Sequence, residues 1–205
     1  MISITPESMS QRENYKFLTG SIIPRPIAFV TTQSDEGVVN AAPFSYFNIV
    51  SANPPLISVS VQRKNGAMKD TARNALKLKE FVVHIVDEDI VADVNETAAE
   101  LPADESELSR TNFTLVKSER IAVPAVKEAK IRFECKLEEA IQLGGQSGEV
   151  GCDLLIGKIV CYHIEPSLYQ AGRINAEALK PVARLAGNNY SKLGQTFEIK
   201  RPTSL

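Results

Sequence analysis

The sequence predicts a mainly β protein, an antiparallel barrel with a few inserted helices. Short runs of β-branched and aromatic residues recur along the chain, bounded by Gly, Pro, Asn or charged turns. They do not alternate regularly with helical segments, as a doubly wound parallel sheet requires. The 205 residues, 43% of them hydrophobic, are enough for one sizeable core. Because no repeat or linker divides the chain, we expect a single domain over residues 1–205.

Five segments carry the strand signal. The segment from Ile131 to Glu138 alternates apolar and polar residues at every step, which is the period of a strand with one wet face. The last segment is interrupted by Gly157, which in a strand usually marks a bulge or a barrel corner. We therefore expect a curved sheet with strands at Ile27–Thr32, Leu56–Gln62, Phe81–Val86, Ile131–Glu138 and Asp153–Ile164.

Helical signals are fewer. The segment Thr71–Lys79 consists largely of good helix formers, and Asp70 directly before it is a suitable N-cap. A second helix is expected over residues 88–100, ended by Pro102. The acidic and polar stretch Pro102–Arg110 predicts an exposed excursion.

Composition excludes several classes of function. The net charge of −2 and the pI near 5.8 give no long-range field that would attract nucleic acid or anionic lipid. The chain contains no run of about 18 apolar residues, so we expect no membrane span. Three widely spaced cysteines and the lack of a secretory signal indicate a reducing cytoplasm.

Several familiar catalytic motifs are absent. The chain contains no G-x-G-x-x-G, no P-loop and no G-x-S-x-G nucleophile elbow. Its only histidines, His84 and His163, lie inside strand-like runs without a ligand-spaced Cys or His partner, so no metal site is expected. We expect both to face solvent or to bond to backbone.

A phosphate site is indicated after the second strand. Arg63 is followed by a short loop with Gly66, and then by Lys69 and Thr71 at the expected helix start. Two cations, a hydroxyl and free helix-terminal N–H groups favour a phosphate monoester. The alternative is an exposed helix start with ordinary surface ion pairs, and these residues alone leave both interpretations open.

A site for a flat ring is indicated upstream, in the segment Val39–Asn48. Its small residues let backbone approach a heteroaromatic ligand, whose edge the amides of Ala42 to Ser45 and the Asn40 side chain could bind. Phe44 or Phe47 would shield the ring from water. The alternative is a bulged edge strand with both phenylalanines in the core, and the residues alone favour it.

Four motifs follow one another along the chain: PRPIAFVTT from Pro24, GVVNAAPFSYF from Gly37, NPPLIS from Asn53 and KDTARN from Lys69. In this order they resemble the flavin reductase-like, FMN-binding split-barrel family, in the branch of flavoredoxin and nitrilotriacetate monooxygenase component B. Weaker similarity continues to Tyr190, although Ala186 stands where that family usually has glycine.

The resemblance implies a split β-barrel homodimer with one FMN per subunit near the dimer interface and with NADH or NADPH as transient electron donor. It places the isoalloxazine and ribityl chain beside Asn40, Ala42 and Ser45, with Thr31 or Thr32 next to them. It places the phosphate on Ser60, Arg63, Lys69 and Thr71. Arg25 and Asn74 are further cofactor-binding candidates by the same resemblance.

Three functions are compatible with the sequence. The first is an NAD(P)H-dependent flavin reductase that supplies reduced FMN to a partner monooxygenase. The second is a flavoredoxin-like electron carrier, which exchanges electrons with another redox protein without nicotinamide turnover. The third is a flavin- or haem-binding module for storage or sensing.

Overall fold

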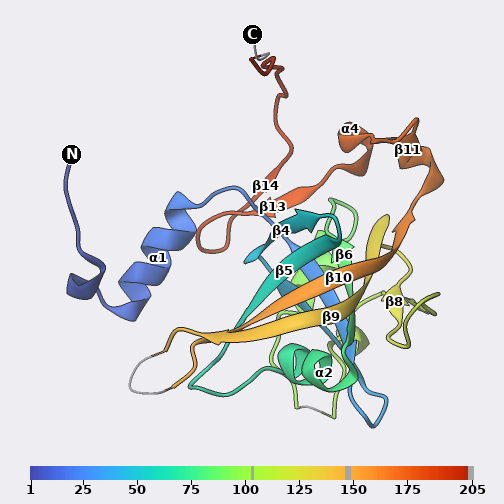
Figure 1. Cartoon of the computed structure of the whole chain (residues 1–205), viewed down its shortest axis with the longest axis horizontal. Coiled ribbons are helices and arrows are strands. Elements are labelled where there is room, and N and C mark those ends of the chain that lie inside the picture. Colours follow the sequence, from blue (N-terminus) through green and yellow to red (C-terminus); the bar gives the residue numbers. More distant parts are fainter. Residues whose placement is uncertain (103, 146–148, 203–205) are drawn as a thin grey trace.

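The computed structural model describes residues 1–102, 104–145 and 149–202, and it confirms the mainly β prediction (Figure 1). Its centre is a seven-stranded antiparallel sheet in the order β3-β2-β6-β9-β10-β5-β4. Each of the five predicted strand segments forms part of this sheet. The strands are β2 Ala28–Gln33, β3 Val39–Phe44, β4 Phe47–Ala52, β5 Pro55–Gln62, β6 Glu80–Ile85, β9 Ile131–Leu143 and β10 Cys152–Ile164.

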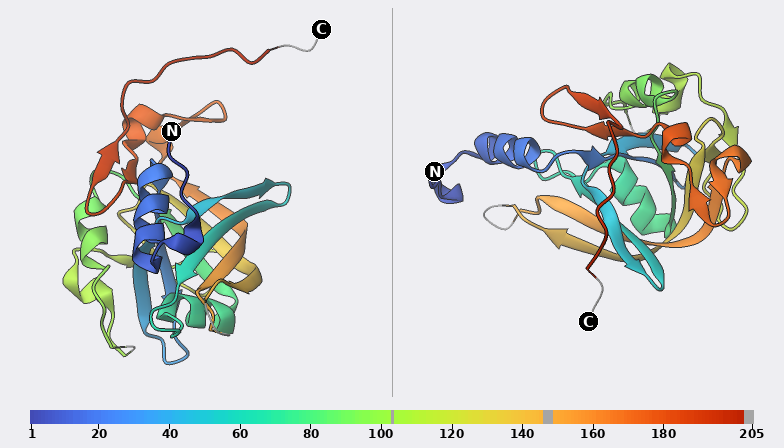
Figure 2. Two further views of the ribbon diagram at one scale, coloured as in Figure 1. Left: turned by 90° about the vertical axis from the view of Figure 1, so that its left-hand side faces the viewer. Right: turned by 90° about the horizontal axis from the view of Figure 1, so that it is seen from above.

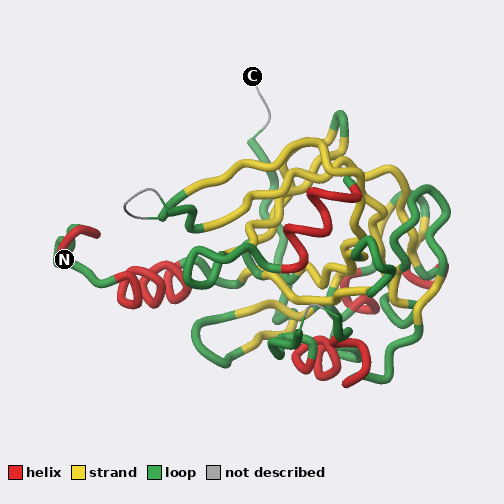
Figure 3. The backbone as a smooth tube through the Cα atoms, turned by 90° about the horizontal axis from the view of Figure 1, so that it is seen from below, coloured by secondary structure: helices red, strands yellow, loops and turns green. Residues whose placement is uncertain are grey.

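The sheet curls into an incomplete barrel. Its two edge strands, β3 and β4, follow each other directly in the chain and are joined by Ser45 and Tyr46. The amide of Ser60 in β5 donates to the Tyr46 carbonyl at 2.8 Å, which draws this corner onto the opposite side of the sheet. Helix α2 (Asp70–Leu78) lies across one end of the barrel (Figure 3). Its Ala72 and Ala75 are buried in the main core.

Smaller elements surround this barrel. Strand β1 (Arg25–Pro26) pairs with β13 (Val182–Arg184), which pairs with β14 (Tyr190–Lys192). Two further two-stranded ribbons are β7 (Leu115–Val116) with β8 (Ala125–Val126), and β11 (Tyr169–Gln170) with β12 (Arg173–Ile174). The remaining helices are α1 Gln11–Ser21, α3 Val91–Glu96 and α4 Ala176–Leu179, with 3-10 turns η1 Pro6–Ser8, η2 Glu107–Arg110 and η3 Pro166–Leu168.

Helix α1 was not predicted, although the sequence contains its start signal. Ser10 and Glu13 form a reciprocal capping box: the Glu13 amide donates to Ser10 Oγ at 3.3 Å and the Ser10 amide to Glu13 Oε2 at 2.8 Å. The helix projects from the body of the molecule and leaves Tyr15, Phe17 and Leu18 exposed (Figure 2).

Two predicted segments differ from the structure. The helix expected over residues 88–100 spans only Val91–Glu96, because the Glu88 amide donates to the Lys180 carbonyl and the chain turns at Thr97. The stretch Pro102–Arg110 is not exposed throughout, since Glu107 is buried against β3.

The predicted Asp70 cap of α2 is also wrong. The N-cap residue is Lys69, no side chain caps the helix, and Asp70 is its first helical residue. The Asp70 carboxylate pairs instead with Arg73 in the same turn. The negative charge still favours this helix end through the macrodipole, but the first amides keep no side-chain acceptor.

The histidine prediction is confirmed for His84 only. His84 is fully buried, its Nδ1 lies 2.9 Å from the Phe29 carbonyl, and its Nε2 accepts the Val126 amide at 2.8 Å. The ring is therefore neutral with its proton on Nδ1. His163 bonds instead to the carboxylate of Glu134 at 2.6 Å.

Among the described residues, none of the helices has the length and apolar content needed to cross a lipid bilayer.

The bulge predicted at Gly157 is confirmed, and it yields a stability prediction. The register of β9 and β10 shifts between Ile156 and Gly157, and an added Cβ at Gly157 would lie 2.4 Å from the Phe81 ring in the core. We expect Gly157→Ala to lower the free energy of unfolding by about 1–3 kcal/mol through overpacking. Denaturant unfolding checks this, with Gly194→Ala as control because no atom lies within 4 Å of that position. Equal losses in both variants would contradict the packing argument.

A second prediction concerns pH. Burial, with the Arg132 charge as a smaller contribution, lowers the pKa of His84 from 6.5 to about 4, although the bond to the Phe29 carbonyl opposes this shift. The unfolded chain therefore binds more protons between these values, so His84 makes the free energy of unfolding rise with pH from about 4 to 6.5 and level off above. We expect the His84 ring resonances in NMR spectra to stay unshifted from pH 7 to about 5. The variant His163→Asn leaves His84 as the single histidine and so assigns the signals. A titration midpoint near 6.5 would refute the prediction.

Candidate functional site

A cleft of about 530 Å³ lies beside β3 at the start of α2. One wall is β3 with Asn40 and Ala42, and another is the loop of residues 64–69 with the first helical turn. The third wall is the segment of residues 97–101 together with Glu107. The structure thus brings together four of the residues that the sequence assigned to a cofactor, namely Asn40, Ala42, Lys69 and Thr71.

Four buried polar side chains at the base of this cleft are joined to one another by hydrogen bonds. Asn40 Nδ2 donates to Thr71 Oγ1 at 2.9 Å and lies 3.4 Å from Thr32 Oγ1. Asn74 Nδ2 also lies 3.4 Å from Thr32 Oγ1. The bonds join β2, β3 and α2. Because Asn40 donates to Thr71, the hydroxyl hydrogen of Thr71 remains available to an acceptor in the cleft.

The start of α2 is the electropositive end of the cleft. The first amides of a helix have no intrahelical acceptor, and no side chain caps them here. Lys69 and Thr71 line the cleft at this point. Unpaired amides, the positive end of the helix dipole, an ammonium group and a hydroxyl are together the donors that a phosphate group requires.

A buried carboxylate lies on the opposite wall. Glu107 Oε2 accepts the Ala41 amide at 3.0 Å, and Ser106 Oγ donates to the Val39 carbonyl at 2.5 Å. The two side chains thus cover the free edge of β3. Burial raises the pKa of the Glu107 carboxyl, whereas the Ala41 amide opposes that rise.

Strand alternation decides between the two threonine candidates. Thr32 faces α2 and belongs to the buried polar group with Asn40 and Asn74. Thr31 points to the other face of β2, where its hydroxyl donates to the Pro124 carbonyl at 2.8 Å. The structure therefore does not bring Thr31 to the cleft.

Arg63 is bound to a carboxylate instead of lining the cleft. Its Nε and Nη2 donate to the two carboxylate oxygens of Asp153 at 2.8 and 2.7 Å, and this bidentate pair raises the pKa of Arg63. Asp153 is buried, so the arginine compensates a charge inside the protein. Arg63 does not line the cleft.

Arg25 and Ser45 belong to a neighbouring cleft of about 360 Å³ between α1 and the β3–β4 corner. Arg25 is buried, and it donates to the carbonyls of Thr19, Ile22 and Leu185, which ties α1 and the C-terminal segment to the barrel. Its Nε lies 3.5 Å from Ser45 Oγ.

Ser60 takes part in the barrel corner through its amide, and its hydroxyl accepts from Gln62. Like Arg63, it lies outside the lining of the first cleft.

Sequence reasoning missed the third wall of the cleft. Lys64 and Glu100 form an exposed ion pair at 2.6 Å, and both side chains line the cleft. Glu107 also went unnoticed, since it lies in a stretch that reads as exposed. No local pattern marks these contacts, because they connect residues 36 positions or more apart.

A family model described as "Flavin reductase like domain" matches residues 19–178. The chain is also 54% identical over 199 residues to the uncharacterized protein YwrF of Bacillus subtilis, covering 96% of this chain and 97% of that protein.

Two solved structures are similar along nearly the whole chain. One is nitrilotriacetate monooxygenase component B from Bacillus cereus, with a TM-score of 0.95, 61% identity and coverage of 97% of this chain and 98% of that one. The other is the 2-nitrobenzoate 2-nitroreductase NbaA of Pseudomonas fluorescens, with a TM-score of 0.89, 32% identity and coverage of 100% and 98%. The resemblance seen in the sequence is therefore confirmed: the chain belongs to the flavin reductase-like family of split-barrel flavoproteins.

Proposed function

We propose that this protein is an FMN-binding oxidoreductase that accepts electrons from NADH or NADPH and passes them on as reduced flavin. The observation that carries the proposal is the cleft in which an uncapped helix start lies beside a strand of small residues. The first can hold a dianionic phosphate and the second can admit a flat ring. We treat residues 1–205 as one domain; residues 103, 146–148 and 203–205 are not among those that the structure describes.

The phosphate would bind to the first amides of α2, the Lys69 ammonium and the Thr71 hydroxyl. Asn40 orients Thr71 by donating to its oxygen, so that the hydroxyl hydrogen can point outward. The exposed pair of Lys64 and Glu100 stands at the rim and can open for the cofactor at little cost. We assign no phosphate contact to Arg63, because its guanidinium compensates Asp153.

The ring and ribityl chain would lie along β3 toward Ser45. Ala42 offers no side chain beyond Cβ, so the backbone of β3 can approach the ligand. Glu107 and Ser106 bind the outer edge of β3 and keep it in place. Thr32 and Asn74 support Asn40 from below and, in this proposal, do not touch the cofactor.

Bound flavin supplies two-electron chemistry, in which it accepts a hydride and later gives up the electrons. The chain contributes position: its amides orient the ring, and apolar walls exclude water from it. The described residues of the cleft include no histidine or cysteine, and we assign no catalytic acid or base. Nicotinamide would bind transiently in the open part of the cleft.

A partner protein and a second copy of the chain complete the proposal. The Bacillus cereus relative is named as a monooxygenase component, which supports a partner monooxygenase as electron acceptor. Exposed apolar side chains on β4 and at the C-terminal end of α1, among them Leu18, Ile22, Ile49 and Val50, supply the surface that a homodimer would bury. We place the protein in the cytoplasm, in keeping with a cytoplasmic nicotinamide pool.

Removal of Lys69 tests the phosphate assignment. We expect Lys69→Ala to weaken FMN binding by roughly ten- to a hundredfold, because a hydrogen bond to a charged group contributes about 1.5–3 kcal/mol. Fluorescence titration of apoprotein with FMN measures the dissociation constant. The matched control is Lys77→Ala in the last turn of the same helix, where the lysine pairs with Asp35 away from the cleft. Identical affinities in the wild type and Lys69→Ala would remove the phosphate from this place.

Anaerobic mixing with NADH and then NADPH tests the activity. The reductase should bleach its flavin absorption within seconds with at least one of the two, followed at the long-wavelength flavin band in a stopped-flow instrument. Persistent colour with both nucleotides, together with bleaching by a reduced redox protein, would favour the electron carrier. A protein that takes up no FMN at all would contradict both.

A further inference from the structure

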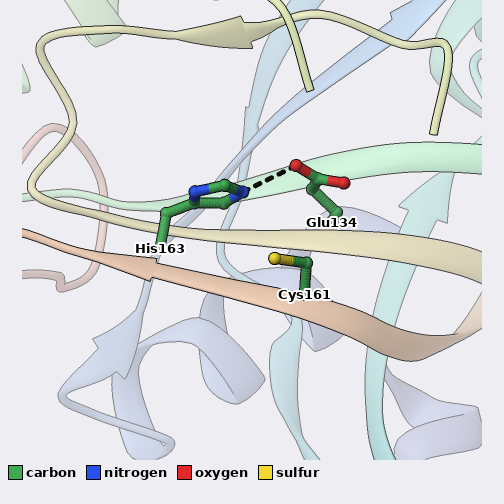
Figure 4. Close-up of side chains that lie close together, drawn as sticks. All are labelled: Glu134, Cys161 and His163. Atoms are coloured by element: carbon green, nitrogen blue, oxygen red, sulfur yellow. Dashed lines mark hydrogen bonds and ion pairs between the residues drawn. The ribbon is translucent and has the colours of Figure 1, made fainter. Parts of the chain in front are cut away.

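Three metal-ligating side chains meet on the outer face of β9 and β10, away from the cleft. They are Glu134, Cys161 and His163, whose ligand atoms all lie within 4.8 Å of one another. Figure 4 shows His163 and Glu134 directed toward each other, with the Cys161 sulfur beside them. None of the three lines the candidate flavin cleft.

A bulge in β10 produces this arrangement. Ile159 lies opposite Cys135, but Cys161 lies opposite Glu134, so Val160 is an additional residue. Without it, Cys161 would share the inner face with the buried Ile159. With it, Tyr162 takes the inner face against the Phe133 ring, and Cys161 and His163 both move to the face of Glu134.

The Glu134 carboxylate is fixed before any ligand arrives. It is fully buried, its Oε1 accepts the Glu119 amide at 2.7 Å and its Oε2 accepts the Arg120 amide at 2.7 Å. The loop that carries these amides is itself held, because Ser118 Oγ donates to the Val123 carbonyl and the Ala122 amide donates to Glu80. Such outer contacts orient a metal ligand and raise the affinity of its site.

We propose that Glu134, Cys161 and His163 form a binding site for one transition-metal ion of the zinc class. A thiolate, an imidazole nitrogen and a carboxylate oxygen are the ligands that zinc uses in proteins. Three protein ligands leave the fourth position to water, which can reach the site because Cys161 and His163 are partly exposed.

Binding requires only a local change. The thiol gives up its proton to solvent, and the imidazole coordinates through Nε2 in the neutral form that carries its proton on Nδ1. Zn–N and Zn–O bonds of about 2.0–2.1 Å place two such ligand atoms roughly 3.3 Å apart in a tetrahedron. The present distance of 2.6 Å between His163 Nε2 and Glu134 Oε1 must therefore widen. The imidazole can rotate for this, while the two loop amides keep hold of the carboxylate.

Metal titration of the full-length flavin-loaded protein tests the proposal. After chelation and dialysis, Zn²⁺ is added in competition with a chromophoric chelator, and bound zinc is counted by elemental analysis. We expect one zinc per chain. Cys161→Ser and His163→Asn should each weaken binding at least about tenfold, since loss of an outer-shell partner alone already costs about 10–100-fold. FMN content should stay unchanged in both variants, which separates this test from the proposed function.

Cys152→Ser is the matched control, because Cys152 is another partly exposed thiol on the same strand. It should bind zinc like the wild type. Failure of the wild type to compete with the chelator, or equal affinity in the wild type and Cys161→Ser, would overturn the proposal. Loss of binding in Cys152→Ser alone would overturn it too, since the metal would then lie elsewhere.

A spectrum of the wild type covers the case in which a variant does not fold. Co²⁺ added to the wild-type protein should give a difference spectrum with a thiolate-to-cobalt charge-transfer band. Zn²⁺ should abolish this band. Absence of the band would show that no thiolate binds the metal and would refute the site without any variant.

Discussion

The hydrogen bond from Asn40 to Thr71 is the contact on which the candidate flavin site depends. It joins the small-residue strand β3 to the start of α2 at 2.9 Å, inside a group of buried polar side chains. Loss of one partner would leave a buried amide or hydroxyl without its bond, which is costly in a protein interior. The start of α2 and the small-residue wall of β3, where we propose that the phosphate and the ring bind, therefore keep a fixed position relative to each other. A ligand with a ring at one end and a phosphate at the other meets a site that is already organised.

This contact is possible because the sheet turns at Ser45 and Tyr46. The corner brings the end of β3 over β5, and the loop after β5 returns to β3 as the start of α2. A closed barrel would pair β3 along its whole length and leave no cleft beside it. The incomplete barrel leaves that edge free, and Ser106 and Glu107 take up part of its bonding capacity. The cleft thus lies where the sheet fails to close.

The sequence predicted what depends on local pattern. Strand alternation at Ile131–Glu138 and the glycine at position 157 identified real features of the sheet, since both reflect backbone geometry that nearby residues impose. The sequence motifs predicted that Asn40, Ala42, Lys69 and Thr71 belong to one site, and the structure places all four in the lining of one cleft. Arg63 shows the limit of such reasoning: its partner Asp153 lies 90 residues away, and no local pattern reveals a buried carboxylate that requires a cation. The burial of Glu107 was missed for the same reason, because it depends on the edge of a strand that is distant in the sequence.

Strand β10 shows how one irregular strand can serve two faces of a sheet. At Gly157 the missing side chain lets Phe81 fill the core, so the first irregularity serves interior packing. At Val160 the additional residue reverses the alternation, so that Cys161 and His163 leave the inner face and join Glu134 outside. The second shift has a packing consequence as well, since it places Tyr162 against the Phe133 ring on the inner face. It also groups a thiol and an imidazole at a carboxylate that two backbone amides already orient, and the proposed cation site depends on this arrangement.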